Sequence, residues 1–123
     1  MIQASYMHQY KRTDRIGDQI RAEIADIIVR RLKDPRVGFV TVTSVEVSED
    51  LRHAKVFVSI LGDEKTQSET MNGLKSAAGF IRGEIGRRIR IKFNPEIIFK
   101  LDKSIEEAAH ILGILEEIKK EEI

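Results

Sequence analysis

The segment KSAAGFIRGEIGRRIRIK, residues 75–92, has the apolar spacing of a helix but contains residues that weaken one. Its apolar residues recur at steps of three and four, the spacing of one buried helix face. Three glycines interrupt the segment: Gly79, Gly83 and Gly86. Each costs about 1 kcal/mol relative to alanine inside a helix. We therefore expect this helix to bend or to approach another backbone closely.

Two interpretations of the glycines follow from their neighbours. Ala77-Ala78-Gly79 predicts a bend between two helices, because small residues relieve the crowding at a bend. The run from Gly83 to Gly86 has the spacing of the nucleic-acid-clamping GxxG loop of KH domains. The acidic Glu84 within this run is unsuited to contact with phosphates, and the apolar stripe continues through it. We therefore interpret Gly83 and Gly86 as helix-packing positions.

A compact group of cations lies in and after the glycine-containing part of the segment. Its members are Arg82, Arg87, Arg88, Arg90 and Lys92. The planar guanidinium of arginine matches the geometry of phosphate, and Glu84 is the one acidic residue among these cations. The pattern predicts a phosphate-binding surface whose affinity falls with salt. Aromatic residues are few, and Phe80 is expected in the core rather than stacked on a base.

Outward from this segment, the chain predicts an α+β fold. The expected elements are a helix over 13–33 with Thr13 or Asp14 as N-cap, strands over 39–48 and 51–61, a helical region over 65–92, a strand over 97–101, and a final helix from Ser104 with Glu107 in a capping box. The two early strands are joined by a short connection, which predicts an antiparallel hairpin. Helices should cover one face of a three-stranded sheet. The other face is expected to be open or partly covered by the final helix.

Length and charge limit the choices further. The chain of 123 residues is the size of one domain, contains no cysteine, and carries a net charge of +1. Residues 82–103 carry seven Lys and Arg against three Asp and Glu, whereas residues 104–123 carry two against six. A local basic patch is the electrostatic footprint of a polyanion-binding protein, although a solvated surface of mixed charge is the alternative. No apolar run is long enough to cross a bilayer, so we expect a cytoplasmic protein with no membrane partner.

Enzyme chemistry finds little support in the sequence. His8, His53 and His110 are far apart and lack metal-ligand spacing. The chain has no GxSxG, P-loop or HExxH pattern. We expect no catalytic residue, no metal site, no cofactor and no small-molecule substrate.

Several ordered blocks resemble the ribosome-binding factor A family. They are RTDRIGDQIRAEIADII (12–28), DPRVGFVTVTSVEVSEDLRHAKVFVS (34–59), AAGFIRGEIGRRIRIKFNPEIIF (77–99) and DKSIEEAAHI (102–111). The resemblance implies a type II KH-like fold of order α-β-β-α-kink-α-β plus a C-terminal helix. In that fold an Ala-x-Gly kink, here Ala77-Ala78-Gly79, replaces the GxxG loop. The expected organisation is a flexible leader over 1–12, the KH-like RNA-binding domain over 13–103, and a C-terminal helix with an acidic tail over 104–123.

The resemblance also implies a function. It is that of a non-catalytic ribosome assembly factor, a monomer that binds the immature 30S small ribosomal subunit and its 16S rRNA. The family promotes late maturation, including processing of the rRNA 5′ end, and supports growth in the cold. The alternatives are a protein-interaction module that acts through the final amphipathic helix and, less favoured, a ribonuclease.

The candidate RNA-binding residues fall into two areas. The first comprises Lys75, Ala77, Ala78, Gly79, Arg82, Arg87, Arg88, Arg90 and Lys92. The second, with the weaker argument, comprises Arg12, Arg15, Arg52 and Lys55.

Overall fold

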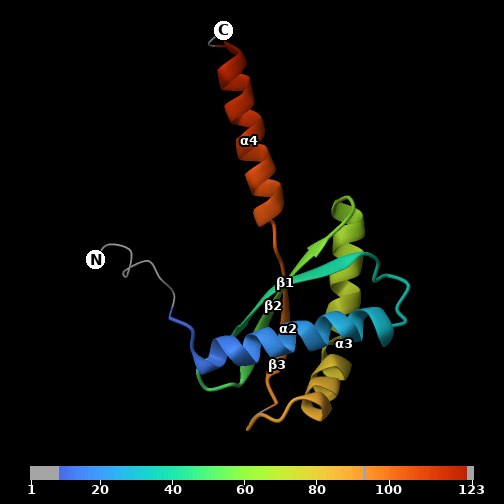
Figure 1. Cartoon of the computed structure of the whole chain (residues 1–123). Helices are drawn as coiled ribbons and strands as arrows, with labels where there is room; N and C mark the ends of the chain where they lie inside the picture. Colours follow the sequence, from blue (N-terminus) through green and yellow to red (C-terminus); the bar gives the residue numbers. More distant parts are fainter. Residues whose placement is uncertain (1–8, 93, 122–123) are drawn as a thin grey trace.

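The computed structural model describes residues 9–92 and 94–121 of the chain. The elements in order are α2 (Arg12–Arg30), β1 (Val40–Val47), β2 (His53–Ile60), α3 (Glu64–Arg88), β3 (Glu96–Leu101) and α4 (Ser104–Glu121). Figure 1 shows α2 crossing one face of the sheet, α3 beside it, and α4 projecting away. The predicted α+β fold with a three-stranded sheet is confirmed. Of the predicted leader, residues 1–8 lie outside the described residues, whereas Arg12 already belongs to α2.

The sheet has the order β1-β2-β3. β1 and β2 pair antiparallel, which confirms the predicted hairpin. β3 pairs parallel to β2, since the long helix α3 carries the chain back to the start of the sheet. A register irregularity between Val42 and Ser44 inserts one extra residue, Thr43, into β1.

The core lies between the sheet and the two helices α2 and α3. In β2, Ala54, Val56 and Val58 alternate with residues on the other face and are fully buried. In α2, the predicted apolar stripe is confirmed, and Ile20 and Ile24 have no exposed surface. The hydrophobic core therefore consists mainly of branched aliphatic side chains. They recur every second residue in the strands and about every 3.6 residues in the helices.

Gly17 sets the distance between α2 and the sheet. A Cβ atom at this position would lie 2.8 Å from the carbonyl oxygen of Val45 in β1. Backbone atoms cannot move aside as the end of a flexible side chain can. The close approach of the first turns of α2 to the end of β1 therefore requires that residue 17 has no side chain.

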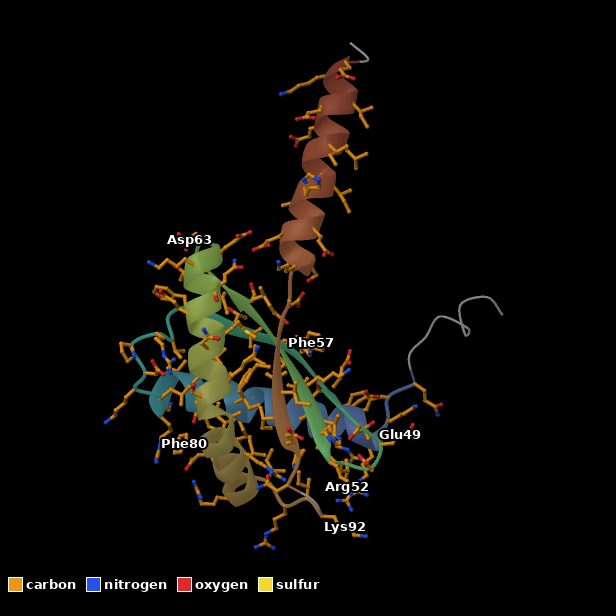
Figure 2. All side chains as sticks on the ribbon, turned by 180° about the vertical axis from the view of Figure 1, so that it is seen from behind. Glu49, Arg52, Phe57, Asp63, Phe80 and Lys92 are labelled. Atoms are coloured by element: carbon orange, nitrogen blue, oxygen red, sulfur yellow. The ribbon has the colours of Figure 1, made fainter. Side chains whose placement is uncertain are left out.

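The region over 65–92 forms one helix rather than two. α3 runs without interruption from Glu64 to Arg88, and the carboxylate of Asp63 caps it by accepting the N–H of Thr66 at 2.8 Å. The helix is not interrupted at Ala77-Ala78-Gly79, where a break was expected. Its axis nevertheless changes direction near Phe80 (Figure 2). The backbone hydrogen bonds of a helix persist through a gentle bend, so the glycine alone does not end the helix.

The predicted helix starts require correction by a few residues. Lys11, rather than Thr13 or Asp14, is the N-cap of α2, and the Asp14 carboxylate accepts the Lys11 N–H at 2.7 Å. α4 begins with Ser104 already inside the helix, where its N–H donates to the Asp102 carboxylate at 2.9 Å.

A cluster of ion pairs joins α2 to the end of α3. The guanidinium of Arg88 donates to Glu23 at 2.9 Å and to Asp26 at 2.8 Å, both on α2. On its own helix, Arg88 also lies 3.5 Å from Glu84, which pairs in turn with Arg87. The side chain of Glu84 is only 9% exposed. Its hydrogen bond from Arg87 holds the pKa of Glu84 below its ordinary value.

The final helix covers neither face of the sheet. Every described side chain of α4 is exposed, and the helix makes no extensive packing contact with another described element. One hydrogen bond links its first turn to α3, from Gln67 Nε2 to Glu106 Oε1 at 3.1 Å. The sheet face opposite α2 is therefore open in this structure, one of the two arrangements expected.

Two glycine substitutions should separate close packing from helix propensity. Gly17→Ala should lower the free energy of unfolding by about 1–3 kcal/mol, because its Cβ overlaps the β1 backbone. Gly79→Ala should raise it by up to about 1 kcal/mol, because a Cβ there meets no atom within 4 Å. Urea unfolding followed by circular dichroism measures both. Equal losses in the two variants would contradict this account of α2 packing.

The contribution of Glu84 to stability should depend on pH. Because its pKa is lowered in the folded state, its contribution is complete above its ordinary pKa of 4.5 and is lost as pH falls through the folded-state value. The difference in the free energy of unfolding between the native protein and Glu84→Gln should be constant from about pH 5 to about pH 7 and shrink in more acidic solution. Glu69→Gln, at an exposed position of the same helix, is the control and should show no such trend. A difference that is independent of pH would refute the assignment.

Candidate nucleic-acid interface

The exposed side of the second half of α3 carries a strip without side chains. Gly79, Gly83 and Gly86 recur at steps of four and three, so they lie on one side of the helix. A Cβ atom at Gly79 would meet nothing within 4 Å. At Gly83 it would meet the guanidinium of Arg87, at 3.6 Å, and no other described side chain. We call these three positions the glycine strip.

The strip changes the interpretation of two glycines. A Cβ atom at Gly86 would lie 2.9 Å from the side-chain amide of Asn94, in the connection to β3. Neither Gly83 nor Gly86 contacts another helix. The prediction of packing positions holds for Gly86, which packs against the connection to β3 rather than against another helix, and is wrong for Gly83. The structure confirms that both lie in a helix rather than in a GxxG loop.

Cations and one aromatic ring border the glycine strip. Lys75 lies one turn before Gly79 and is exposed, and Arg82 and Arg87 are exposed on the turns that follow. Phe80 is 42% exposed, so the expectation that it belongs to the core was wrong. A polyanion approaching the strip would meet positive charge on a helix whose opposite side is fixed in the core.

The two alanines of the predicted kink face the other way. Ala77 and Ala78 are half-buried and pack against the hydrophobic core. Their contacts with the core fix the position of this turn of α3, while part of each side chain stays exposed. Gly79, on the exposed side of the same turn, is more accessible to a nucleic acid than either alanine.

One shallow cavity of about 330 Å³ brings together Arg52 and Arg82, which are 30 positions apart in the sequence. Its other lining residues are His53, Asn94 and Glu96. The guanidinium of Arg82 donates to the Asn94 carbonyl through Nε at 3.1 Å and a terminal nitrogen at 2.8 Å. These bonds fix its orientation. Across the cavity, His53 Nε2 lies 3.7 Å from a carboxylate oxygen of Glu96.

The turn between β1 and β2 positions Arg52. Asp50 accepts hydrogen bonds from the Ser48 hydroxyl at 2.7 Å and from the Arg52 N–H at 3.1 Å. Between them, Leu51 is buried and adopts a φ of 61°, a left-handed conformation that is uncommon for a residue with a side chain. This tight turn, anchored by the buried Leu51, presents Arg52 at the end of the sheet, the same end of the molecule as Lys92 (Figure 2).

The predicted cation cluster divides into paired and unpaired members. Arg88 is held by carboxylates of α2, and hydrogen bonding to Asp26 raises its pKa above the ordinary value. Its charge is thus largely compensated inside the protein. Arg90 is exposed and has no ion pair with any described residue. It borders a cavity of about 440 Å³ together with Gln19 and Ala22 of α2.

The second predicted area is only partly brought together. Arg12 and Arg15 are exposed in the first turn of α2, whose Gly17 packs on the end of β1 close to the turn that carries Arg52. Lys55 lies on the open face of the sheet, opposite the helices. It belongs to a different surface from the glycine strip.

Sequence reasoning missed the residues that organise this interface. Glu23 and Asp26 belong to another helix, and no local pattern links them to Arg88. Asn94 carries a weak signal, because it precedes Pro95 and so ends the preceding helical region. Within the described ranges, no group of three His, Asp or Glu side chains is arranged to hold a metal ion, and no helix is long and apolar enough to cross a membrane.

Comparison with known proteins gives a consistent result. The family model described as ribosome-binding factor A matches residues 12–115. Ribosome-binding factor A of Halothermothrix orenii is 54% identical over 112 residues, which cover 91% of this chain and 92% of that protein. The protein of the same name from Desulfitobacterium hafniense is 52% identical over 111 residues, covering 90% of this chain and 89% of the relative.

Solved structures agree with the fold. The crystal structure of ribosome-binding factor A from Thermus thermophilus superposes with a TM-score of 0.65 at 24% identity, covering 75% of this chain and 97% of that one. The solution structure of a Thermotoga maritima protein, named as a candidate ribosome binding factor A, gives 0.70 at 37% identity, with 81% and 95% covered. Since both the family model and relatives more than half identical extend over most of its length, the chain belongs to the ribosome-binding factor A family.

Proposed function

We propose that this protein is a ribosome assembly factor that binds the immature small ribosomal subunit through its 16S rRNA. Membership of the family supports a ribosomal partner. A Thermus thermophilus ribosome binding factor A model has been fitted into the electron cryomicroscopy map of a 30S complex. In this proposal the protein acts as a cytoplasmic monomer, without a cofactor, and promotes late maturation and processing of the rRNA 5′ end.

The observation that carries the proposal is the glycine strip with its border of cations. Without side chains at Gly79 and Gly83, a sugar-phosphate backbone can approach the helix closely. Arg82 and Arg87 then lie within reach of phosphates along the same path, and Phe80 offers a ring for stacking. Recognition of this kind reads backbone and shape rather than base sequence.

The mechanism we propose is a shift in conformational populations. A rigid protein surface that fits one arrangement of the rRNA lowers its free energy relative to the others. The protein would hold the immature 5′ region in an arrangement accessible to processing enzymes. When later folding steps replace that arrangement, the complementary surface is lost and the protein dissociates. No catalytic group is required for this cycle.

A second candidate function is a protein-interaction module, and the exposure of α4 favours it. Five large apolar side chains of this helix are 43–60% exposed. Surfaces of this kind commonly bind other proteins. The two functions are compatible, because α4 and the glycine strip belong to different parts of the molecule.

Filling the glycine strip should weaken RNA binding without weakening the fold. Gly79→Gln places a side chain in open space on the strip and improves helix propensity. We expect affinity for the immature subunit to fall by about tenfold, or about 1.4 kcal/mol, while the melting temperature stays the same or rises. Gly113→Gln is the matched control, since Gly113 of α4 also faces open space. Unchanged affinity of the Gly79 variant would exclude the strip as a contact.

Removing one unpaired cation should change the salt dependence of binding. Arg90→Ala should lower the slope of log affinity against log salt by about 0.7–0.9, the value for one phosphate contact. Lys65→Ala removes an exposed cation at the start of α3, at the other end of the helix, and should leave the slope unchanged. Binding to 16S rRNA fragments at several salt concentrations gives both slopes. Equal slopes for Arg90→Ala and the native protein would remove Arg90 from the interface.

The assembly role has its own test. Sedimentation should find the native protein on immature small subunits and depleted from mature subunits and polysomes. The purified protein alone should leave rRNA precursors uncut. Association with mature subunits only would contradict the assembly role, and cleavage abolished by one histidine or carboxylate substitution would contradict the non-catalytic role.

A further inference from the structure

The open face of the sheet carries an apolar patch. Phe39 and Leu61 lie beside each other, joined by the hydrogen bond from the Leu61 N–H to the Phe39 carbonyl, and are 81% and 75% exposed. Phe57 of β2 and Ile98 of β3 are half-buried on the same face. Figure 2 looks onto this side, where no helix crosses in front of the strands near Phe57.

α4 presents a second apolar surface that no other described element covers. Its exposed apolar residues recur at helical steps: Ile111, Leu112, Ile114, Leu115 and Ile118. An isolated helix of about this length is marginal in water, and Gly113 weakens it further. The helix therefore gains stability when its apolar side packs on another surface.

We propose that α4 folds back at Asp102 and Lys103 and packs on the open face of its own sheet. α4 has 18 residues and β2 has eight. At about 1.5 Å per helical residue and about 3.3 Å per strand residue, both are about 27 Å long. The other face already holds α2 and α3, so the open face is the one available to a helix that follows β3.

The two surfaces match in position and charge. A helix that turns back after Leu101 places Ile111 about 10 Å along the sheet, level with Ile98. Glu107 then lies level with Lys100, on the flank of the apolar stripe. Lys55, paired in register with Ile98, would lie beneath the helix, which carries more carboxylates than cations. Folded back, α4 thus buries apolar residues and brings Glu107 near Lys100, whereas Lys55 already lies opposite Glu46 of β1.

Few contacts hold α4 in the projecting position. Asp102 accepts the Thr43 hydroxyl at 2.7 Å and the Ser104 N–H at 2.9 Å, which ties the end of β3 to the sheet. Beyond that point, the described structure contains one side-chain hydrogen bond to the rest of the protein, between Gln67 and Glu106. A net gain from burying two apolar surfaces is sufficient to replace one exposed hydrogen bond. Folding back would also cover Lys55, so α4 would control access to this part of the predicted RNA-binding surface.

The absence of cysteine permits a direct distance measurement. Glu46→Cys on the open face and Glu117→Cys on the solvent side of α4, both spin-labelled, report the position of the helix in the full-length protein. Folding back should shorten the distance between labels by about 15 Å relative to the projecting arrangement. Leu115→Glu should abolish the short distance, whereas Lys120→Glu, on the polar side of α4, should preserve it.

Two results would overturn the proposal. One is a single long distance under all conditions, which would leave α4 free for another protein. The other is a short distance that disappears when labelled protein is diluted with an excess of unlabelled protein, because α4 would then pack on a second copy. A short distance that persists on dilution supports the intramolecular contact. Since the measurement requires no RNA, its outcome is separate from that of the proposed function.

Discussion

The arrangement of this protein depends on how Arg88 joins the end of α3 to α2. Its guanidinium bridges Glu23 and Asp26 on one helix and approaches Glu84 on its own helix. A half-buried charge of this kind is tolerated only when several partners neutralise it. The cluster holds the second half of α3 at a fixed rotation about its axis. Ile81 and Ile85 then face the core, and the glycine strip faces outward.

This orientation explains why α3, which contains four glycines, retains two of them, Gly79 and Gly83, on its outward side. Glycines that pack a helix against its neighbours would contribute to stability, but among the described elements none lies within contact distance of a Cβ atom placed at Gly79 or Gly83, apart from α3 itself. The destabilisation, about 1 kcal/mol for each residue, is offset by the packing of the opposite side of α3. What the glycines provide is an accessible backbone bordered by cations. One side of α3 thus stabilises the fold by packing in the core, and the opposite side leaves its backbone accessible to a ligand.

Much of the fold follows from local patterns. Three local patterns predicted the elements and the fold class: the apolar stripe of α2, the alternation in β2 and the short hairpin connection. They suffice because the apolar side of a helix and the apolar side of a strand must pack together to form a core. The continuity of α3 did not follow, since a weak local propensity at Gly79 is overridden by tertiary packing. Phe80 was misplaced for a related reason: one step around a bending helix moves a side chain from the core to the surface.

The sequence by itself determined the apolar stripe of α2 and the alternation of β2 that form much of the core, the presence of a basic segment around residue 90, and the resemblance that pointed to the family. Only the tertiary structure decided which cations remain available to a polyanion. Arg87 and Arg88 look equivalent along the chain, yet Arg87 pairs with Glu84 of its own helix and stays 66% exposed, whereas Arg88 is held by carboxylates of α2, more than 60 positions away. Arg52 and Arg82 look unrelated, yet they line one cavity. The physical reason is that charge neutralisation acts over a few ångströms in space, and separation along the chain does not report that distance.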